Sequence, residues 1–371
     1  MTSDAEGSPV AFVGHPFVSI GKGEELRANA RALESLDEPI AFYDVYRAAA
    51  RTDPDHVKLV GSREIRRLGA GKRIFHINGD EIEPVLARLS ATGSSFSEGY
   101  NIVVPAWELP VFPKVWAASV QRFDEVWAIS NFVKDGLAAI GIDSVYIGQS
   151  VEIPFGPLLS RRYFGIRESA FVFLAFMDFS SFSARKNPRG AVEMFKQLIA
   201  RRPFDDLQLV IKVKGDDSAS QEFLKDVGLD SEHVVIVDRL LDTFEQHSLI
   251  NACDCLTSLH RSEGFGRGPA EAMYCGRLAL ATGWSGNADF MSDANSLPIR
   301  SEFVPVREGE YPQYDGQYWA EPDIEHAVEL ALGVVDRPGD ALRRATQGRA
   351  DIMRLMGNRA VGLRMLERLS Q

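Results

Sequence analysis

The chain of 371 residues lacks the features of several large protein classes. It has no uninterrupted apolar run of about 18 residues, the length that a membrane-spanning helix needs. Its formal net charge of −11 argues against a nucleic-acid partner. Residues 1–9 are polar and acidic, without the basic and apolar regions of a secretory signal. These absences indicate a cytoplasmic protein and leave peripheral contact with the inner face of a membrane open.

Cysteine is scarce as well. Cys253, Cys255 and Cys275 are an odd number without metal-ligand spacing, so we expect reduced and buried thiols. His260 has no partner at ligand spacing, and the two acidic residues in 214–217 are more typical of a turn after a strand than of a metal site. The sequence therefore predicts neither a bound metal nor a cofactor.

What is present is an ordinary globular composition, 45% hydrophobic and 25% charged, in a chain long enough for two domains. Strand-like apolar runs alternate with helical patterns in both halves. The predicted strands are 10–14, 40–46, 73–78, 100–106, 125–129 and 144–147, then 170–176, 207–214, 233–237, 255–259 and 277–281. Such alternation predicts an α/β fold with two doubly wound parallel sheets.

The predicted helices lie between and after these strands. They are 24–36, 112–124, 131–140, 187–200, 219–227, 242–252, a short helix from Pro269, 323–335 and 341–369. Residues 301–321 read as a loop-like insert, and 150–157 as an interdomain linker. We therefore expect domains at 1–155 and 156–340, with the C-terminal helix 341–371 packing back on the first.

The most informative stretch is the strand-to-helix segment 259–276. It places Glu263 in a loop with Gly264, Gly266 and Gly268, and Glu271 in the first turn of the next helix, which Gly276 ends. Glycines let backbone approach a ligand closely, and a helix start attracts anions. The segment is suited to a nucleotide sugar. An ordinary glycine-rich turn, with glutamate favoured by the helix dipole, explains the pattern about equally well.

Several segments together resemble family 4 of the retaining glycosyltransferases, which have the GT-B fold. Glu263 and Glu271, with seven residues between them, resemble the family's E-x7-E signature. Segment 177–188 resembles the first loop of the donor domain, although Phe179-Ser180 stands where many members carry Gly-Arg. Arg185 beside Lys186 would supply the missing charge. Further similar segments are 274–282, 284–289, 107–110 and 123–130.

The resemblance implies two Rossmann-like domains that face each other across a cleft, residues 1–155 on the acceptor side and 156–340 on the donor side. It implies a metal-independent hexosyltransferase that retains anomeric configuration, with a nucleotide sugar as co-substrate and a glycan or lipid-linked acceptor, as in polysaccharide biosynthesis. Lys186 and Arg185 would stabilise the diphosphate, Glu263 would bind the sugar and Glu271 the ribose. The other implied donor residues are Gly264, Phe265, Gly266, Arg267 and Gly268. Structural roles are equally open for Arg267, Trp284, Ser285 and Asn287.

The first half offers weaker candidates. Gly21, Lys22 and Gly23 precede a helix and would face the diphosphate, unless they form an ordinary turn. Acceptor-side candidates follow predicted strands: His76, Asn78, Asp80, Trp107 and Glu108, the last also a catalytic candidate. A satisfied histidine at a sheet end is the alternative for His76. The alternatives for the whole chain are a catalytically silent nucleotide-sugar-binding or scaffold protein and a GT-B epimerase.

Overall fold

The computed structural model describes residues 8–48, 51, 53–153, 156–179, 182–215, 222–223, 225–228, 230 and 232–371. The chain forms two compact units, unit 1 (Met1–Glu152 with Arg354–Gln371) and unit 2 (Ile153–Met353). Ser180, the acidic pair at 216–217 and part of the predicted helix 219–227 lie outside the described residues.

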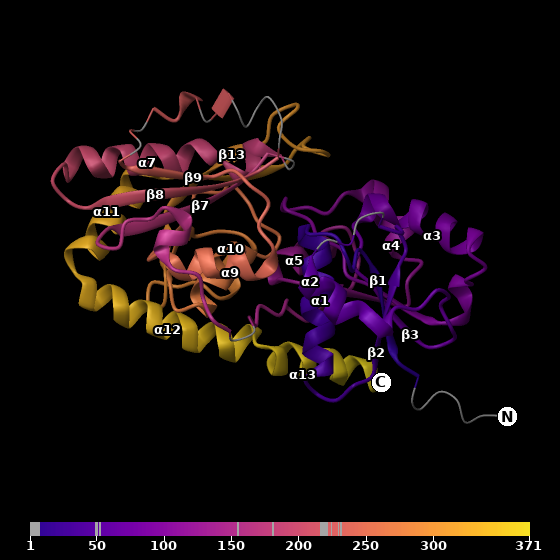
Figure 1. Ribbon diagram of the computed structural model, residues 1–371. Coiled ribbons are helices and arrows are strands. Elements are labelled where there is room, and N and C mark those ends of the chain that lie inside the picture. The colour runs from indigo at the N-terminus through magenta and orange to yellow at the C-terminus, as the bar shows by residue number, and fades with distance from the viewer. Residues whose placement is uncertain are drawn as a thin grey trace. The chain divides into compact units, whose positions relative to one another are not determined.

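Unit 1 is built on a parallel six-stranded sheet of order β2-β1-β3-β4-β5-β6 (Figure 1). The strands are β1 (Val10–Gly14), β2 (Ile40–Asp44), β3 (Lys72–Phe75), β4 (Tyr100–Val103), β5 (Glu125–Ala128) and β6 (Val145–Tyr146). The helices are α1 (Gly21–Glu34), α2 (Pro54–Val60), α3 (Ile82–Ala91), α4 (Ala117–Val120), α5 (Asn131–Ala138) and α13 (Asn358–Leu369). The chain passes from β1 to β2 and then to β3 on the other side of β1, so the topological switch point lies between β1 and β3.

Unit 2 has a second parallel six-stranded sheet, of order β12-β11-β10-β7-β8-β9. The strands are β7 (Phe171–Asp178), β8 (Leu207–Lys214), β9 (Val234–Val237), β10 (Cys255–Ser258), β11 (Leu278–Thr282) and β12 (Leu297–Ile299). The helices are α6 (Ser183–Lys186), α7 (Pro188–Arg201), α9 (Thr243–Ala252), α10 (Arg267–Tyr274), α11 (Ile324–Asp336) and α12 (Pro338–Met356). Here the switch point lies between β7 and β10.

Helices cover both faces of the second sheet, because its central strands are apolar on both sides. Phe173 of β7 packs with Phe195 of α7 on one face, while the next residue, Leu174, packs with Leu249 of α9 on the other. Figure 1 shows α7 over one face and α9 and α10 over the opposite one. The predicted α/β class, with two doubly wound parallel sheets, is confirmed.

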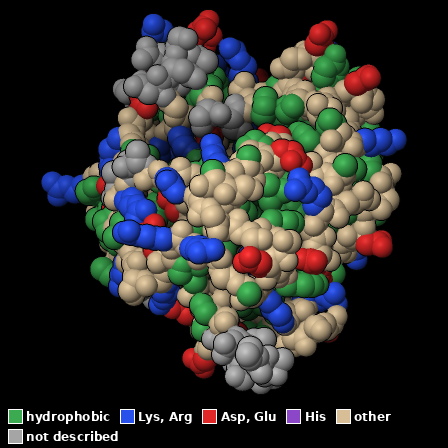
Figure 2. Space-filling view, turned by 90° about the vertical axis from the view of Figure 1, so that its right-hand side faces the viewer, with side chains coloured by type: hydrophobic (Ala, Val, Ile, Leu, Met, Phe, Trp, Pro, Cys, Tyr) green, Lys and Arg blue, Asp and Glu red, His purple; other side chains and the backbone are tan. Residues whose placement is uncertain are grey.

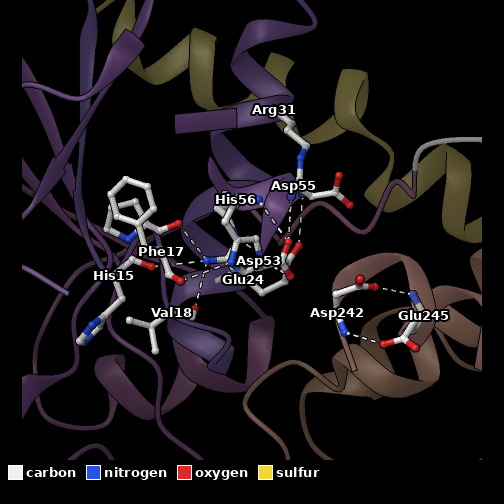
Figure 3. A network of polar contacts seen from close by, with 12 residues as sticks. His15, Phe17, Val18, Glu24, Arg31, Asp53, Asp55, His56, Asp242 and Glu245 are labelled. Carbon is white, nitrogen blue, oxygen red and sulfur yellow. Dashed lines mark hydrogen bonds and ion pairs between the residues drawn. The ribbon is translucent and has the colours of Figure 1, made fainter. Parts of the chain in front are cut away.

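Capping side chains fix several helix starts where the sequence predicts them. Ser130 Oγ accepts a hydrogen bond from the Val133 N–H at 3.1 Å at the start of α5. Asp242 and Glu245 form a reciprocal capping box at the start of α9 (Figure 3). These bonds satisfy N–H groups that a helix start leaves unpaired.

Some predicted elements differ from the structure. The predicted loop 301–321 contains an antiparallel hairpin of β13 (Ser301–Pro305) and β14 (Tyr318–Pro322). The predicted helix 112–124 shortens to α4 after a 3-10 turn that follows Pro113. The predicted helix 341–369 is two helices, because Gly357 has extended backbone between α12 and α13. The chain returns to unit 1 at Arg354, near the end of α12. Helices α2 and α3 and strand β12 have no counterpart in the prediction.

The last helix packs closely on the first. Gly362 of α13 lies so near α1 that a Cβ there would stand 2.4 Å from the Ala32 carbonyl oxygen. Among the described helices, none is long and apolar enough to cross a membrane. On the face drawn in Figure 2, hydrophobic side chains form small groups separated by charged and polar atoms.

Candidate functional site

A polar cluster of unit 2 lies at the switch point of its sheet. The chain leaves β7 into α6, which carries Arg185 and Lys186, and leaves the adjacent β10 into the loop with Glu263. Lys186 Nζ lies 2.5 Å from Glu263 Oε1, and Arg185 Nη1 lies 3.3 Å from Oε2. The Glu263 side chain is 14% exposed and that of Lys186 is 29% exposed, so the pair is accessible. Parallel sheets bind ligands at this edge.

Hydrogen bonds to main-chain carbonyls hold the segment with Arg185 against the segment with Glu263. Arg185 donates from Nη1 to the Ser262 carbonyl at 2.7 Å, and the Arg261 N–H donates to the Arg185 carbonyl at 2.7 Å. Asn187, in the left-handed region at φ 47°, donates from Nδ2 to the Leu259 carbonyl at 2.9 Å. The cations and the carboxylate are therefore positioned by backbone as well as by charge.

Charge decides the protonation of Glu263. Burial works against ionisation, but the neighbouring cations Lys186 and Arg185 outweigh it and lower the pKa of Glu263 to about 2. Burial also lowers the pKa of the adjacent His260 to about 4, so this imidazole is neutral at physiological pH. The cluster is then two cations around one carboxylate, and it has a net positive charge of one.

The glycine-rich loop that carries Glu263 is fixed by the loop after β11. The Glu263 N–H donates to Ser285 Oγ at 2.8 Å, and the Gly286 N–H donates to the Glu263 carbonyl at 2.9 Å. A Cβ at Gly286 would lie 2.3 Å from the Gly264 carbonyl oxygen, so only glycine allows this approach. Ser285 and Gly286 thus support the candidate site from a neighbouring strand end.

Glu271 is buried within α10, with one oxygen 2.7 Å from Arg267 Nε. The helix starts at Arg267, two residues before the predicted position, so Pro269 occupies its third position and Glu271 its second turn. Proline is tolerated there because the first helical N–H groups have no intrahelical partner. The Ala270 N–H already donates to the Gly266 carbonyl at 3.1 Å, which leaves it unavailable for an anion.

Three further predicted donor residues, Phe265, Gly266 and Gly268, lie close to neighbouring residues of the same unit. Phe265 is buried, and its ring centroid lies 5.4 Å from that of Phe290. Gly266 has φ 91°, and a Cβ there would lie 2.6 Å from Asn287 Cβ. Gly268 leaves room for ordinary contacts with Leu256. The loop is therefore shaped by packing at Phe265 and by backbone conformation at Gly266.

The hairpin after β12 adds residues that sequence spacing did not reveal. Arg261 pairs with Glu321 of β14 at 2.5 Å and donates to the Ala184 carbonyl of α6 at 2.6 Å. The Arg185 guanidinium lies 5.9 Å from the ring centroid of Tyr311, between the two strands. Opposite charges about 60 positions apart carry no local signal. The hairpin therefore supports the segment that bears Arg185 and Lys186.

In unit 1, the Lys22 side chain is hydrogen-bonded to other residues of the same unit. Residues Gly21, Lys22 and Gly23 form the first turn of α1 rather than a loop before it. Lys22 Nζ donates to Glu25 Oε1 at 2.9 Å and to the Val104 carbonyl at 2.6 Å, and the side chain is 9% exposed. The structure thus uses this lysine to join α1 to the end of β4.

The acceptor-side candidates lie after β3 and β4, and they differ in exposure. His76 is fully buried, its Nδ1 lies 2.9 Å from Glu25 Oε1, and its ring stacks on Phe12 at 5.8 Å. Asn78 Oδ1 accepts the Ala106 N–H at 3.2 Å, and Asp80 is exposed. The Trp107 indole is buried and donates to the Val111 carbonyl at 2.9 Å, and Glu108 is half-buried. No group of three or more potential metal ligands occurs within the described ranges.

Residues 171–303 match the family model described as glycosyl transferases group 1. No curated protein matches the chain. Among solved structures, sucrose-phosphate synthase from Thermosynechococcus elongatus is similar with a TM-score of 0.66 at 16% identity, covering 98% of each chain. Anabaena HepE in complex with UDP-glucose has a TM-score of 0.64 at 13% identity, covering 98% of this chain and 99% of that one.

A third similar structure is larger than this chain. A mutant of S. aureus TarM has a TM-score of 0.59 at 11% identity, and the match covers 81% of this chain but 55% of the TarM chain. The chain thus spans about half of TarM's length. These likenesses describe architecture, since the identities are low. The chain has the fold of the GT-B glycosyltransferases, and residues 171–303 of its second unit match the glycosyl transferases group 1 model.

Proposed function

We propose that the protein is a glycosyltransferase that moves a hexose from a nucleotide sugar to a hydroxyl acceptor. The observation that carries this proposal is the cluster of Lys186, Arg185 and Glu263 at the switch point of the second sheet, with buried Glu271 on the helix that follows. The cluster has a surplus of positive charge at the edge where parallel sheets bind nucleotides. The group 1 family match over the same segment supports the proposal.

The reaction needs positive charge where the leaving diphosphate becomes more negative. Lys186 is the more exposed cation of the cluster, and its ammonium group can turn from Glu263 to a phosphate oxygen. Arg185, held by the Ser262 carbonyl, adds a second fixed charge. Two side-chain cations can thus stabilise the leaving group without a metal ion, and we include metal independence in the proposal.

The two glutamates would bind hydroxyl groups. An ionised carboxylate accepts two such bonds at once, and Glu263 stays ionised because of its cationic neighbours. We assign Glu263 to the transferred sugar and Glu271 to the ribose. Retention of anomeric configuration belongs to the proposal, by attack on the same face of the sugar, with the acceptor proton passing to the leaving phosphate. HepE was solved with UDP-glucose, which makes UDP-glucose the first donor to test.

Thermal-shift measurements with UDP-, GDP-, ADP- and dTDP-glucose test donor binding, since a ligand that binds the folded state raises the melting temperature. We expect a shift with one nucleotide. Glu271→Ala should weaken its affinity about ten-fold or more, the typical effect of losing a hydrogen bond to a charged group. Lys186→Ala should lower turnover about 100-fold, as removal of a charge-stabilising donor does.

Arg201→Ala, at the far end of α7, is the matched control and should change neither quantity. Absence of any shift with all four nucleotides in the wild type would favour a silent scaffold and overturn the proposal. Normal turnover by both Glu271→Ala and Lys186→Ala would instead show that the site is assigned wrongly.

A further inference from the structure

The cluster in unit 2 lies at the topological switch point of its sheet, and the sheet of unit 1 has a switch point of its own. The switch point of the first sheet lies between β1 and β3, and the crevice of an open α/β sheet lies at the carboxyl ends of the strands there. His15 directly follows β1, Tyr46 comes two residues after β2, and Glu81 lies in the 3-10 turn after β3. These three side chains meet, although the sequence separates them widely.

Their contacts form a compact polar group. Tyr46 Oη donates to Glu81 Oε1 at 2.5 Å, and His15 Nε2 lies 3.5 Å from the same oxygen. The His15 and Tyr46 rings stack in parallel, with centroids 3.6 Å apart and planes 3° apart. Both partners of the His15–Glu81 pair remain partly open, at 16% and 25% exposure. The group is therefore ordered and still within reach of a ligand.

Backbone and second-layer contacts hold these side chains in place. Arg27, buried in α1, donates to the carbonyls of Pro16 and Val18 at 3.1 Å each, which fixes the loop after β1. Figure 3 shows the carbonyls of that loop turned toward this network, while the ring of His15 points away from it. Glu81 Oε2 accepts the Asn78 N–H at 2.8 Å. A ligand would thus meet groups that lose little freedom on binding.

The group has hydrogen-bonding positions left over that suit hydroxyl groups. A carboxylate has about four acceptor positions, and Glu81 uses three at most on Tyr46, His15 and Asn78. The other ring nitrogen of His15, Nδ1, is buried and has no hydrogen-bond partner among the described residues. Burial opposes the charge of Glu81, yet bonds from His15, Tyr46 and the Asn78 N–H lower its pKa to about 2. Glu81 and the exposed Asp80 next to it carry two negative charges, against the positive charge of Arg88, whose guanidinium lies 5.0 Å from the Tyr46 ring centroid. This negative balance disfavours a phosphorylated ligand.

We propose that His15, Tyr46 and Glu81 bind the hydroxyl groups of an uncharged saccharide, which serves as the acceptor in the transfer proposed above. The inference rests on that proposed function. It places the acceptor site at the partly exposed His15, Tyr46 and Glu81 and not at His76, which is fully buried. Glu81 accepts hydrogen bonds from one or two sugar hydroxyls, and His15 and Tyr46 hold its carboxylate in position.

The test measures transfer by the full chain with the nucleotide-glucose that gives the largest thermal shift. The probe acceptors are 4-nitrophenyl α- and β-glycosides of glucose, galactose and mannose, with glucose 6-phosphate as the anionic comparison. We expect the wild type to use a neutral glycoside. Glu81→Gln should raise its KM about ten-fold or more, because a charged acceptor is lost, and leave the donor KM unchanged. Tyr46→Phe, a milder change, should raise the acceptor KM less.

Glu83→Gln is the matched control. Glu83 is an exposed carboxylate on the same helix start, paired with Arg122 at 2.9 Å, and its loss should leave both KM values unchanged. Donor thermal shift and circular dichroism verify that each variant is folded. An unchanged acceptor KM in folded Glu81→Gln or Tyr46→Phe overturns the inference, and so does a wild type that splits the donor but uses only the phosphorylated acceptor or none. Absence of donor binding overturns the proposed function itself.

Discussion

Glu263→Gln keeps the size of the side chain and an oxygen that Lys186 can reach, and it removes only the charge. In the folded protein the carboxylate faces Lys186 at 2.5 Å and Arg185 at 3.3 Å, and the Arg185 side chain is 6% exposed. Without the carboxylate, Lys186 can turn toward solvent, but Arg185 stays buried and loses its contact with the Glu263 charge. The variant should therefore be less stable than the wild type at neutral pH.

The size of this effect follows from the pKa. A carboxyl group whose pKa falls from an ordinary 4.5 to about 2 on folding stabilises the native state by about 3 kcal/mol at neutral pH. Breaking a buried ion pair costs about 3–5 kcal/mol in other proteins. We take the lower value, since Lys186 is 29% exposed and glutamine retains a hydrogen bond.

The sign of the pH dependence is also determined. The unfolded carboxyl takes up a proton near pH 4.5 and the folded one only near pH 2, so the stabilisation is complete above 4.5 and is lost as the pH falls toward 2. Urea unfolding followed by circular dichroism at pH 7, 4 and 3 should give a difference between wild type and variant that shrinks with acidity. Glu325→Gln, which removes an exposed partner of Arg201, should not change stability. A difference below about 1 kcal/mol at pH 7, or one that does not shrink in acid, would refute the reasoning.

Two further substitutions test how unit 1 is held together. Gly23→Ala should destabilise the protein by about 1–3 kcal/mol, the usual cost of overpacking, because the new Cβ would stand 2.3 Å from the Val18 carbonyl oxygen; an unchanged melting temperature would contradict this. Lys22→Met should cost about 3–5 kcal/mol in urea unfolding, because it leaves buried Glu25 without its cation. A loss below 1 kcal/mol, with donor affinity reduced instead, would return Lys22 to the diphosphate role suggested by its sequence context.

The sequence alone determined the class of this fold. Continuous apolar runs such as Phe171–Asp178, separated by helical patterns with capping residues, can be buried on both faces only in a parallel sheet covered by helices. The spacing of Glu263 and Glu271 is also a local property, since both lie in one strand-to-helix segment after β10. The sequence pattern did not predict the hairpin β13–β14, because residues 301–321 show no regular alternation of apolar and polar side chains.

Which side chains meet was decided by tertiary structure. Lys22 has the surroundings of a ligand-binding lysine in sequence, yet the approach of α1 to the end of β4 gives it Glu25 and Val104 as partners. His15, Tyr46 and Glu81 are unremarkable in sequence and meet only because the order β2-β1-β3 brings three strand ends together. Strand order is a long-range property, so spacing along the chain cannot reveal it.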